Sequence, residues 1–319
     1  MSADPSESTS HLHAEPVSNP VVHDQAGIDR YVVAGNPVAH SRSPEIHATF
    51  AAQTGQSLVY ERLLCPLDGF EASIRAFVAA GGRGCNVTVP FKFEAFRLAV
   101  RRTPRAQLAG AVNTFRFDDA SAGGWLGDNT DGAGLLADIE RNAARPLRGQ
   151  RVLLIGAGGA SAGVLGSLIT GRPAEIRVIN RNADKALALA DSHRAWAAEH
   201  GVRLSAGGLD APAPEGRHEV VINGTSASLS GAGLPLPDPD APVLAPGGLA
   251  VDMMYGPSTA PFLDWAAGQA GSGGAQRDGL GMLVEQAAES FQRWHGVRPE
   301  TDPVYAMLRE HDDVLVTAD

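Results

Sequence analysis

Apolar and polar residues follow two patterns along this chain. Short apolar runs of strand length are separated by segments whose apolar residues recur every three or four positions, as at Phe70, Ile74, Phe77 and Val78. Strands and amphipathic helices that follow one another in this way predict an α/β fold. The segments expected to be strands are residues 31–35, 58–64, 85–89, 111–117, 125–127, 151–155, 176–180, 219–223 and 249–254.

The sharpest change from a strand pattern to a helix pattern lies at residues 151–161. A strand, a tight turn and a helix N-terminus in this order let the backbone approach a pyrophosphate, whose charge the helix dipole favours. The small residues of the turn are Gly156, Ala157, Gly158, Gly159, Ala160 and Ser161, with Ser161 where a third glycine usually stands. The pattern favours a dinucleotide site over its alternative, a buried strand–turn–helix without a ligand.

The strand after this turn ends about 24 residues beyond Gly156, where a dinucleotide fold contacts the adenosine ribose. NAD sites usually present Asp or Glu there, but this chain has Asn180, Arg181 and Lys185 around Asn182, which is expected to cap the next helix. Two cations near a helix start suit a 2′-phosphate. We therefore expect NADP, the alternative being two solvated charges.

Two serines precede the first predicted helix. Ser43 stands before Pro44 and Glu45, so we expect it to be the N-cap of that helix, which is a simpler explanation than contact with a ligand. Ser41 has no capping role and is the more suggestive hydroxyl.

A polar set interrupts the apolar segment at residues 85–92. Asn86 and Thr88 share one face of the expected strand, and Lys92 lies in the first turn of the next helix, where a cation opposes the dipole. A solvated lysine is the ordinary explanation, but this placement makes Lys92 a candidate for function.

The loop at residues 127–132 carries Asp128, Asn129 and Asp131, each of which turn or capping chemistry could explain. It has too few oxygen ligands nearby for calcium, and we expect no metal site. Further on, strand-end residues are expected to line a ligand site, with packing an equal alternative for Tyr255. These strand-end residues are Thr225, Ser226, Met254 and Tyr255.

The composition limits the classes of partner that this chain is expected to bind. A net charge of −10 argues against nucleic acid or an anionic membrane surface. The two cysteines, Cys65 and Cys85, stand in a chain without a recognisable export signal, so reduced thiols and a cytoplasmic location are expected.

The length of 319 residues suggests two domains. Residues 1–28 are expected to be a disordered tail, 29–131 a substrate-binding catalytic domain, 132–278 a dinucleotide-binding Rossmann domain, and 279–319 helices that return to the first domain. Near the start of that last segment, Met282 and Gln286 share one side of a helix.

Taken together, these segments resemble the shikimate dehydrogenase family from Tyr31 to about Leu308. The resemblance rests on seven strings in order, which are residues 35–37 with 41–43, 86–92, 111–114, 127–132, 156–161, 180–181 and 278–282.

The resemblance implies NADP-dependent, reversible reduction of 3-dehydroshikimate to shikimate, in the pathway to chorismate and the aromatic amino acids. Lys92 and Asp131 match the catalytic pair, with the division of acid–base work between them open. The positions matching shikimate contacts are Ser41, Ser43, Asn86, Thr88, Asn113, Asp131, Tyr255 and Gln286. The positions matching cofactor contacts are residues 156–161, Asn180, Arg181, Lys185, Gly279 and Met282, to which the strand ends add Thr225, Ser226 and Met254.

The chain departs from this pattern at Asn182, where many relatives have Thr, and at Lys185, where some have Arg; both keep a cap and a cation. One alternative is a quinate/shikimate dehydrogenase that uses NAD. Another is a catalytically silent nucleotide or metabolite sensor on the same scaffold, which the presence of both Lys92 and Asp131 disfavours. A folate-linked dehydrogenase is weaker. The expected partner is a small-molecule substrate, and a second copy of the chain is a candidate.

Overall fold

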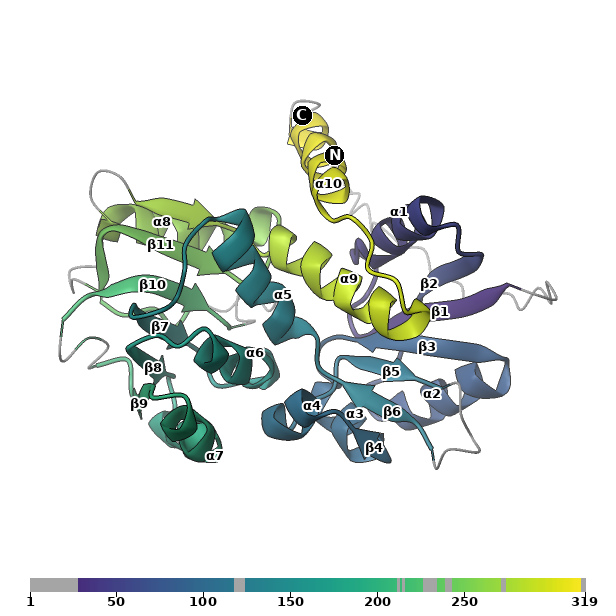
Figure 1. The fold of residues 1–319 in the computed structure, drawn as a ribbon, viewed down its shortest axis with the longest axis horizontal. Helices are drawn as coiled ribbons and strands as arrows, with labels where there is room; N and C mark the ends of the chain where they lie inside the picture. Colours follow the sequence, from purple (N-terminus) through teal and green to yellow (C-terminus); the bar gives the residue numbers. More distant parts are fainter. Residues whose placement is uncertain are drawn as a thin grey trace, which may run out of the picture.

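The computed structural model describes residues 28–117, 124–210, 213, 216–225, 234–238, 243–270 and 274–316. Within these residues, two six-stranded sheets lie at the two ends of the molecule, with helices α5 (Asp131–Ala137) and α9 (Leu280–His295) between them (Figure 1). We call them the N-terminal sheet, within residues 29–128, and the C-terminal sheet, within residues 151–277. The expected α/β class is confirmed.

The N-terminal sheet is mixed. Its strands are β1 (Asp29–Gly35), β2 (Leu58–Leu64), β3 (Gly82–Val87), β4 (Arg101–Arg102), β5 (Thr114–Arg116) and β6 (Leu126–Asp128), in the spatial order β2-β1-β3-β5-β6-β4. β1 runs parallel to β2 and β3, whereas β5 is antiparallel to β3 and β6. The predicted β5–β6 hairpin is confirmed, although residues 118–123 of its turn lie outside the described part.

Helices cover both faces of this sheet. They are α1 (Ser43–Thr54), α2 (Phe70–Ala79), α3 (Lys92–Leu98) and α4 (Pro104–Ala109). Val32 and Ala34 of β1 belong to the apolar cluster that contains Phe70 of α2, whereas Tyr31 and Val33 belong to a separate cluster. This is the alternation expected of a strand buried on both sides.

The start of α1 corrects one expectation. Arg42 is the N-cap residue, Ser43 is the first helical residue, and no side chain caps the helix. The Ser43 hydroxyl oxygen instead accepts a hydrogen bond from the Ser41 hydroxyl, with 3.1 Å between the two Oγ atoms. The capping explanation of Ser43 is therefore wrong.

In the C-terminal sheet every neighbouring pair is parallel. Its strands are β7 (Arg151–Ile155), β8 (Glu175–Ile179), β9 (Arg203–Gly207), β10 (His218–Asn223), β11 (Leu244–Asp252) and β12 (Ala275–Arg277), in the order β12-β11-β10-β7-β8-β9. This is the doubly wound Rossmann order, with the switch point between β7 and β10. Its helices are α6 (Gly159–Thr170), α7 (Ala183–Glu199) and α8 (Ala260–Ala270), with a 3₁₀ turn at Pro257–Thr259.

The chain passes between the sheets along α5, which continues into a π-helical turn at Asp138–Asn142, and returns along α9. Gly134 lets these helices touch, because a Cβ there would lie 2.7 Å from the backbone nitrogen of Gln286. Beyond this crossing, α9 and α10 (Asp302–Val316) bury Phe291 and Leu308 against Phe50 of α1. The C-terminal helices therefore return to the N-terminal sheet, as expected (Figure 1). None of the helices in the described ranges is long and apolar enough to cross a membrane.

Candidate active site

An ion pair joins the start of α3 to the start of α5. Lys92 Nζ lies 2.7 Å from Asp131 Oδ2, and the two side chains are 16% and 7% exposed. Because each residue opens its helix, both side chains stand where strands of the N-terminal sheet end. A mostly buried ammonium held by a carboxylate can stabilise a developing negative charge and exchange a proton.

Asn113 connects this pair to the sheet. Its Nδ2 donates to Asp131 Oδ1 at 2.8 Å and to Thr130 Oγ1 at 2.9 Å, and its Oδ1 accepts from the backbone N–H of Thr130 at 2.8 Å. A carboxylate only accepts and a backbone N–H only donates, so these partners define the orientation of the amide. Gln286 of α9 joins the same group, with its Oε1 3.3 Å from Asn113 Nδ2.

A second buried amide, that of Asn86, is joined to the first through Thr114. Asn86 Nδ2 donates to Ser290 Oγ at 2.9 Å and to Thr114 Oγ1 at 3.0 Å, while Asn86 Oδ1 accepts from the hydroxyl of Tyr60 at 2.7 Å. Thr114 in turn donates to Asn113 Oδ1 at 2.9 Å. Hydrogen bonds thus run from Tyr60 through both amides to Asp131 and Lys92.

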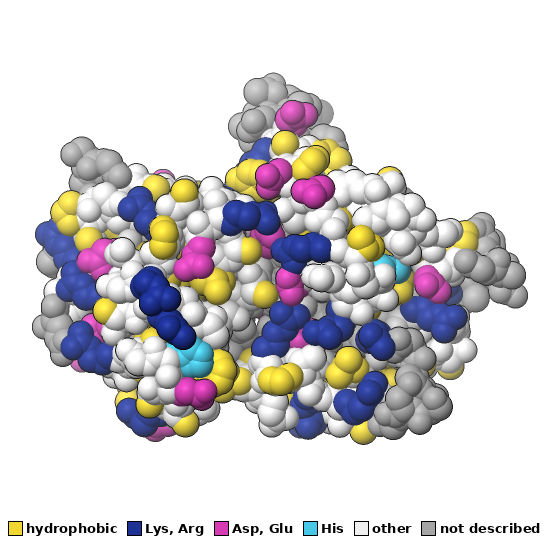
Figure 2. Space-filling view, viewed as in Figure 1, with side chains coloured by type: hydrophobic (Ala, Val, Ile, Leu, Met, Phe, Trp, Pro, Cys, Tyr) yellow, Lys and Arg dark blue, Asp and Glu magenta, His cyan; other side chains and the backbone are white. Residues whose placement is uncertain are grey.

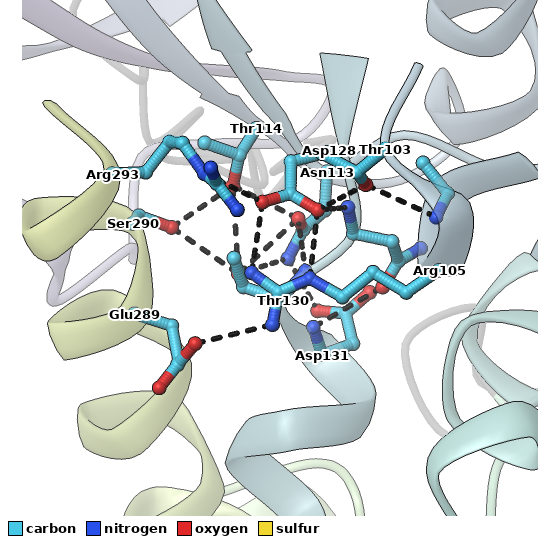
Figure 3. Close-up of polar contacts among 12 residues, drawn as sticks. Thr103, Arg105, Asn113, Thr114, Asp128, Thr130, Asp131, Glu289, Ser290 and Arg293 are labelled. Carbon is cyan, nitrogen blue, oxygen red and sulfur yellow. Dashed lines mark hydrogen bonds and ion pairs between the residues drawn. The ribbon is translucent and has the colours of Figure 1, made fainter.

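Asp128 anchors the loop that carries Asp131. Its side chain is 1% exposed and receives a bidentate contact from Arg105, at 2.7 and 2.8 Å, and a third from Arg293 of α9 at 3.1 Å (Figure 3). Burial alone would raise the pKa of Asp128, but the hydrogen bonds and charge of Arg105, aided by Thr103 and Arg293, hold it below its usual value. Asp128 is therefore an ionic anchor, and turn chemistry alone does not explain it.

The outer side of this ionic group opens to a pocket of about 610 Å³ that Arg105, Arg116 and Arg293 line together with Glu289. Glu289 also pairs with Arg105 at 3.1 Å and with Arg298. Lys and Arg side chains are interspersed with Asp and Glu on the face of the molecule drawn in Figure 2. The arginines at this pocket are therefore largely balanced by carboxylates.

The remaining residues expected near the substrate lie around the same strand ends. Ser43 is buried and hydrogen-bonded to Ser41 and to Tyr60. Thr88 follows β3, where its backbone N–H donates to Ala34 at 2.9 Å. The Tyr255 hydroxyl, from beyond β11, lies 3.4 Å from the carbonyl oxygen of His40. Tyr255 therefore links the C-terminal sheet to the loop that carries Ser41.

The glycine turn after β7 approaches this group from the other sheet. Gly156 has φ +107°, and a Cβ there would lie 3.0 Å from Thr225 Cγ2, whereas a Cβ at Gly158 would meet nothing within 4 Å. A Cβ at Gly159 would lie 3.5 Å from Phe93 and 3.7 Å from Lys92 Cβ. The turn thus presents open backbone next to Lys92, a cradle that fits the pyrophosphate of a dinucleotide.

The end of β8 fits a phosphorylated ribose. Asn182 caps α7 by accepting from the backbone N–H of Lys185 at 3.3 Å, as expected, and Asn180 Nδ2 donates to the carbonyl oxygen of Asn182 at 2.9 Å. Arg181 and Lys185 are both exposed beside this helix start. No carboxylate stands among residues 180–183, although Asp184 precedes Lys185, and one guanidinium and one ammonium group at this strand end are cations of the kind that pair with a phosphate.

Two buried side chains that sequence reasoning missed hold the ends of β10 and β11. Asn223 Nδ2 donates to Asp252 Oδ2 at 3.0 Å, Asn223 Oδ1 accepts from Thr225 Oγ1 at 2.8 Å, and Asp252 Oδ1 accepts from the backbone N–H of Met254 at 2.8 Å. Burial raises the pKa of Asp252 to about 6. These bonds place Thr225 and Met254, both expected near the cofactor, on adjacent strand ends; Ser226 lies outside the described residues.

Gly279 and Met282 join the strand ends to α9. The backbone N–H of Gly279 donates to the carbonyl oxygen of Met254 at 2.7 Å, and a Cβ at Gly279 would lie 2.5 Å from the carbonyl oxygen of Met253. Met282 is buried in the apolar cluster of the C-terminal sheet. Gly279 therefore brings the backbone at the base of α9 close to Met254.

Sequence reasoning also missed Ser290, Tyr60 and His47. Ser290 lies one helical turn after Gln286 on α9, a spacing that could have indicated it. His47 is fully buried and stacks on Tyr60 with ring centroids 4.2 Å apart, and burial lowers its pKa to about 3. Nothing in the local pattern marked Tyr60 and His47, because their partners come from other elements.

Among the described residues, no group of three or more His, Cys, Asp or Glu side chains is placed to hold a metal ion.

Comparison with known proteins agrees with this geometry. Family models match residues 33–115 (shikimate dehydrogenase substrate binding domain), 138–205 (shikimate/quinate 5-dehydrogenase) and 279–309 (shikimate 5′-dehydrogenase C-terminal domain). A shikimate dehydrogenase (NADP(+)) of Acidovorax sp. (strain JS42) is 57% identical over 89% of this chain and 97% of its own length. Another, from Methylibium petroleiphilum, is 56% identical over 90% of this chain and 96% of its own.

Solved structures give the same result. A shikimate 5-dehydrogenase of Thermus thermophilus, in complex with NADP(H) and shikimate, matches with a TM-score of 0.72 and 32% identity over 89% of this chain and 99% of that one. An Ael1 enzyme from Pseudomonas putida matches with a TM-score of 0.76 and 44% identity over 88% of this chain and 98% of that one. On these identities and coverages, this chain belongs to the shikimate dehydrogenase family.

Proposed function

We propose that this protein is an NADP-dependent shikimate dehydrogenase, which interconverts 3-dehydroshikimate and shikimate. The observation that carries the proposal is the Lys92–Asp131 pair, 2.7 Å apart, placed beside the open glycine turn after β7. A proton-transfer pair next to a dinucleotide cradle is what hydride transfer to a carbonyl requires. A sensor would need only the cradle.

In the reductive direction, bound NADPH supplies a hydride to the C3 carbonyl carbon of the substrate. The carbonyl oxygen then carries the electron pair as a developing alkoxide. Lys92 Nζ stabilises that charge and gives a proton to the oxygen, and in the oxidative direction it takes the proton back. Asp131 orients Lys92 through Oδ2, while its Oδ1 is held by Asn113 Nδ2 at 2.8 Å.

The substrate contacts are proposed on the same basis. Hydroxyl and carboxylate groups of shikimate need hydrogen-bond partners in fixed orientations, and the two buried amides have such orientations. The proposed substrate-binding residues are Ser41, Ser43, Asn86, Thr88, Asn113, Tyr255 and Gln286. In this assignment residues 29–131 bind substrate, and residues 279–319 complete that domain by returning Gln286 to it.

The cofactor contacts belong to residues 132–278 and the base of α9. Backbone at residues 156–161 would hold the pyrophosphate, and Arg181 and Lys185 the 2′-phosphate. Met254, Gly279 and Met282 would lie toward the nicotinamide. Asn180, Thr225 and Ser226 complete the proposed set.

We also propose a cytoplasmic location, supported by the buried free thiols of Cys65 and Cys85, which a reducing compartment preserves. A homodimer is proposed as well, and sedimentation analysis of the purified protein would test it.

Steady-state rates with shikimate and quinate, each with NADP⁺ and NAD⁺, test the function. Shikimate with NADP⁺ should give the highest kcat/KM. A preference for quinate with NAD⁺ would instead support a quinate dehydrogenase, and failure to reduce either cofactor would contradict the enzyme proposal.

A further inference from the structure

Ser290 lies where four polar groups of the site meet. Its side chain is 0% exposed, and its Oγ lies 2.9 Å from Asn86 Nδ2, 2.9 Å from Thr114 Oγ1 and 3.2 Å from Thr130 Oγ1 (Figure 3). It also lies 3.1 Å from the carbonyl oxygen of Gln286. These partners come from β3, β5, the loop before α5, and α9 itself, so one hydroxyl ties the returning helix to the strand ends.

The direction of each hydrogen bond follows from the donors and acceptors available. The Gln286 carbonyl can only accept, so the single proton of Ser290 points to it. The Ser290 oxygen then accepts from Asn86 Nδ2 and can accept from the Thr130 hydroxyl, because Thr114 gives its single proton to Asn113 Oδ1. Asn86 Nδ2 also faces the carbonyl oxygen of Asn113 at 3.3 Å, another pure acceptor, which places Asn86 Oδ1 toward Tyr60.

Without the Ser290 oxygen, Asn86 loses one of its two shortest amide partners, and a space opens into which the carboxamide can turn. Thr130 loses an acceptor too, and its hydroxyl is left with Asn113 Oδ1 at 3.2 Å and Gln286 Oε1 at 3.3 Å. Both amides that we assign to substrate binding are therefore supported by one hydroxyl that cannot itself reach solvent.

We propose that Ser290 is a positioning residue for substrate binding, which holds the Asn86 and Asn113 amides in the orientation that shikimate needs. This inference rests on the proposed substrate contacts of those two amides. Ser290 contacts Asn86 directly. It is connected to Lys92 only indirectly, by hydrogen bonds through Thr130, Asn113 and Asp131. Its loss should therefore weaken substrate binding more than the chemical step.

The test is Ser290→Ala and Ser290→Cys in the full-length protein, with kcat and both KM values measured for shikimate and NADP⁺. The thiol keeps the volume of the side chain but is a weak hydrogen-bond partner, so both variants should behave alike. We expect KM for shikimate to rise about tenfold, as loss of a buried hydrogen bond implies, with kcat within about threefold and KM for NADP⁺ within about twofold.

Thr301→Ala is the matched control. Thr301 is buried, and its hydroxyl oxygen accepts from Arg141 at 2.5 Å, away from the proposed substrate residues. This variant should lower the Tm without changing either KM. The unsubstituted protein must oxidise shikimate with NADP⁺, and its failure to do so would contradict the proposed function rather than the role of Ser290.

Three results would overturn the role of Ser290. They are a KM for shikimate within twofold of the unsubstituted protein in both variants, an equal rise of KM for shikimate and NADP⁺, and recovery of the original KM by Ser290→Cys alone. The last would show that Ser290 fills space rather than directing the amides.

Discussion

The two sheets present their proposed ligands with different parts of the chain. At the N-terminal sheet, buried side chains form the proposed site, and Asn86, Asn113 and Asp131 each have defined hydrogen-bond partners. At the C-terminal sheet, the turn after β7 presents open backbone at Gly158, where a Cβ would meet nothing within 4 Å. A ring substrate with several hydroxyls is distinguished by directed side chains, whereas a pyrophosphate is held by N–H groups that many sequences can supply.

The same contrast appears in their buried carboxylates. Asp128, at the N-terminal sheet, is paired with Arg105 and Arg293, which hold its pKa below the usual value despite burial. Asp252, at the C-terminal sheet, has Asn223 and a backbone N–H as partners, and burial raises its pKa. The negative charge of Asp128, at the proposed substrate site, is compensated by arginines, whereas that of Asp252, at the proposed cofactor site, is only partly compensated.

The largest effect should come from Lys92. Lys92→Ala should lower kcat about a thousandfold with little change in KM, because it removes the proton donor and the charge beside the reacting oxygen. Lys92→Arg, which keeps the charge but does not release its proton, should be nearly as slow. Steady-state kinetics with shikimate would measure both. A Lys92→Ala turnover near that of the unsubstituted enzyme would place the chemistry elsewhere.

The pH dependence of the free energy of unfolding should distinguish Asp252 from Asp128, with a smaller effect than that of Lys92→Ala. The pKa of Asp252 is raised from 3.8 to about 6, so the folded protein holds a proton that the unfolded chain releases, and the resulting stability is lost as pH rises from about 4 to 6. That loss is at most about 3 kcal/mol, and Asp252→Asn should remove it. Asp128 has the opposite sign, because its contribution is lost as pH falls below its usual pKa.

Urea unfolding between pH 4 and pH 8 would measure the contribution of Asp252, and extending the series below pH 4 would measure that of Asp128. The free energy of unfolding of Asp252→Asn, relative to the unsubstituted protein, should improve as pH rises. A constant difference across this range would mean that Asp252 does not titrate there.

Substitutions in the glycine turn after β7 should have the next largest effect. Gly156→Ala should lower the free energy of unfolding by about 2 kcal/mol, because φ is +107° and the new Cβ would press on Thr225. Gly158→Ala has an ordinary φ of −91° and open space around its Cβ, so it should leave stability nearly unchanged and raise KM for NADP⁺. Thermal unfolding and KM together distinguish the two. Equal loss of stability in both would contradict the distinction.

The smallest effect is expected at the exposed cations. Arg181→Ala should raise KM for NADP⁺ about tenfold and leave KM for NAD⁺ unchanged, since only the former carries the 2′-phosphate. Lys185→Ala should act in the same direction. If KM for both cofactors rises together, these residues shape the adenosine site rather than read its phosphate.

Local signals predicted much of this fold. The β7–turn–α6 unit was evident from its glycines, and Asn182 was identified as a cap from its position before a helix. The edge strands β9 and β12 were not expected, because their sequences, RLSAG and AQR, contain few apolar residues.

The site was predictable only where a residue was out of place locally. Lys92 was noticeable because it opposes a helix dipole, whereas Ser290 looks like any small helical residue, and Asp128 like a turn residue. Their roles depend on partners 204 residues away in the case of Ser290 and Asn86, and 165 in the case of Asp128 and Arg293. Such contacts are set by tertiary packing, which single-sequence patterns do not contain.

The return of α9 has a consequence for biosynthesis. Phe50 of α1 and Asn86 of β3 leave the ribosome early, yet Phe291 and Ser290, which cover and bond to them, are made only after the whole C-terminal sheet. A nascent N-terminal half therefore exposes an apolar face and leaves the Asn86 amide to water until the last helices emerge. Premature termination before residue 280 should give a chain that needs chaperone protection and has no assembled site, so the cell obtains either a finished enzyme or a substrate for proteolysis.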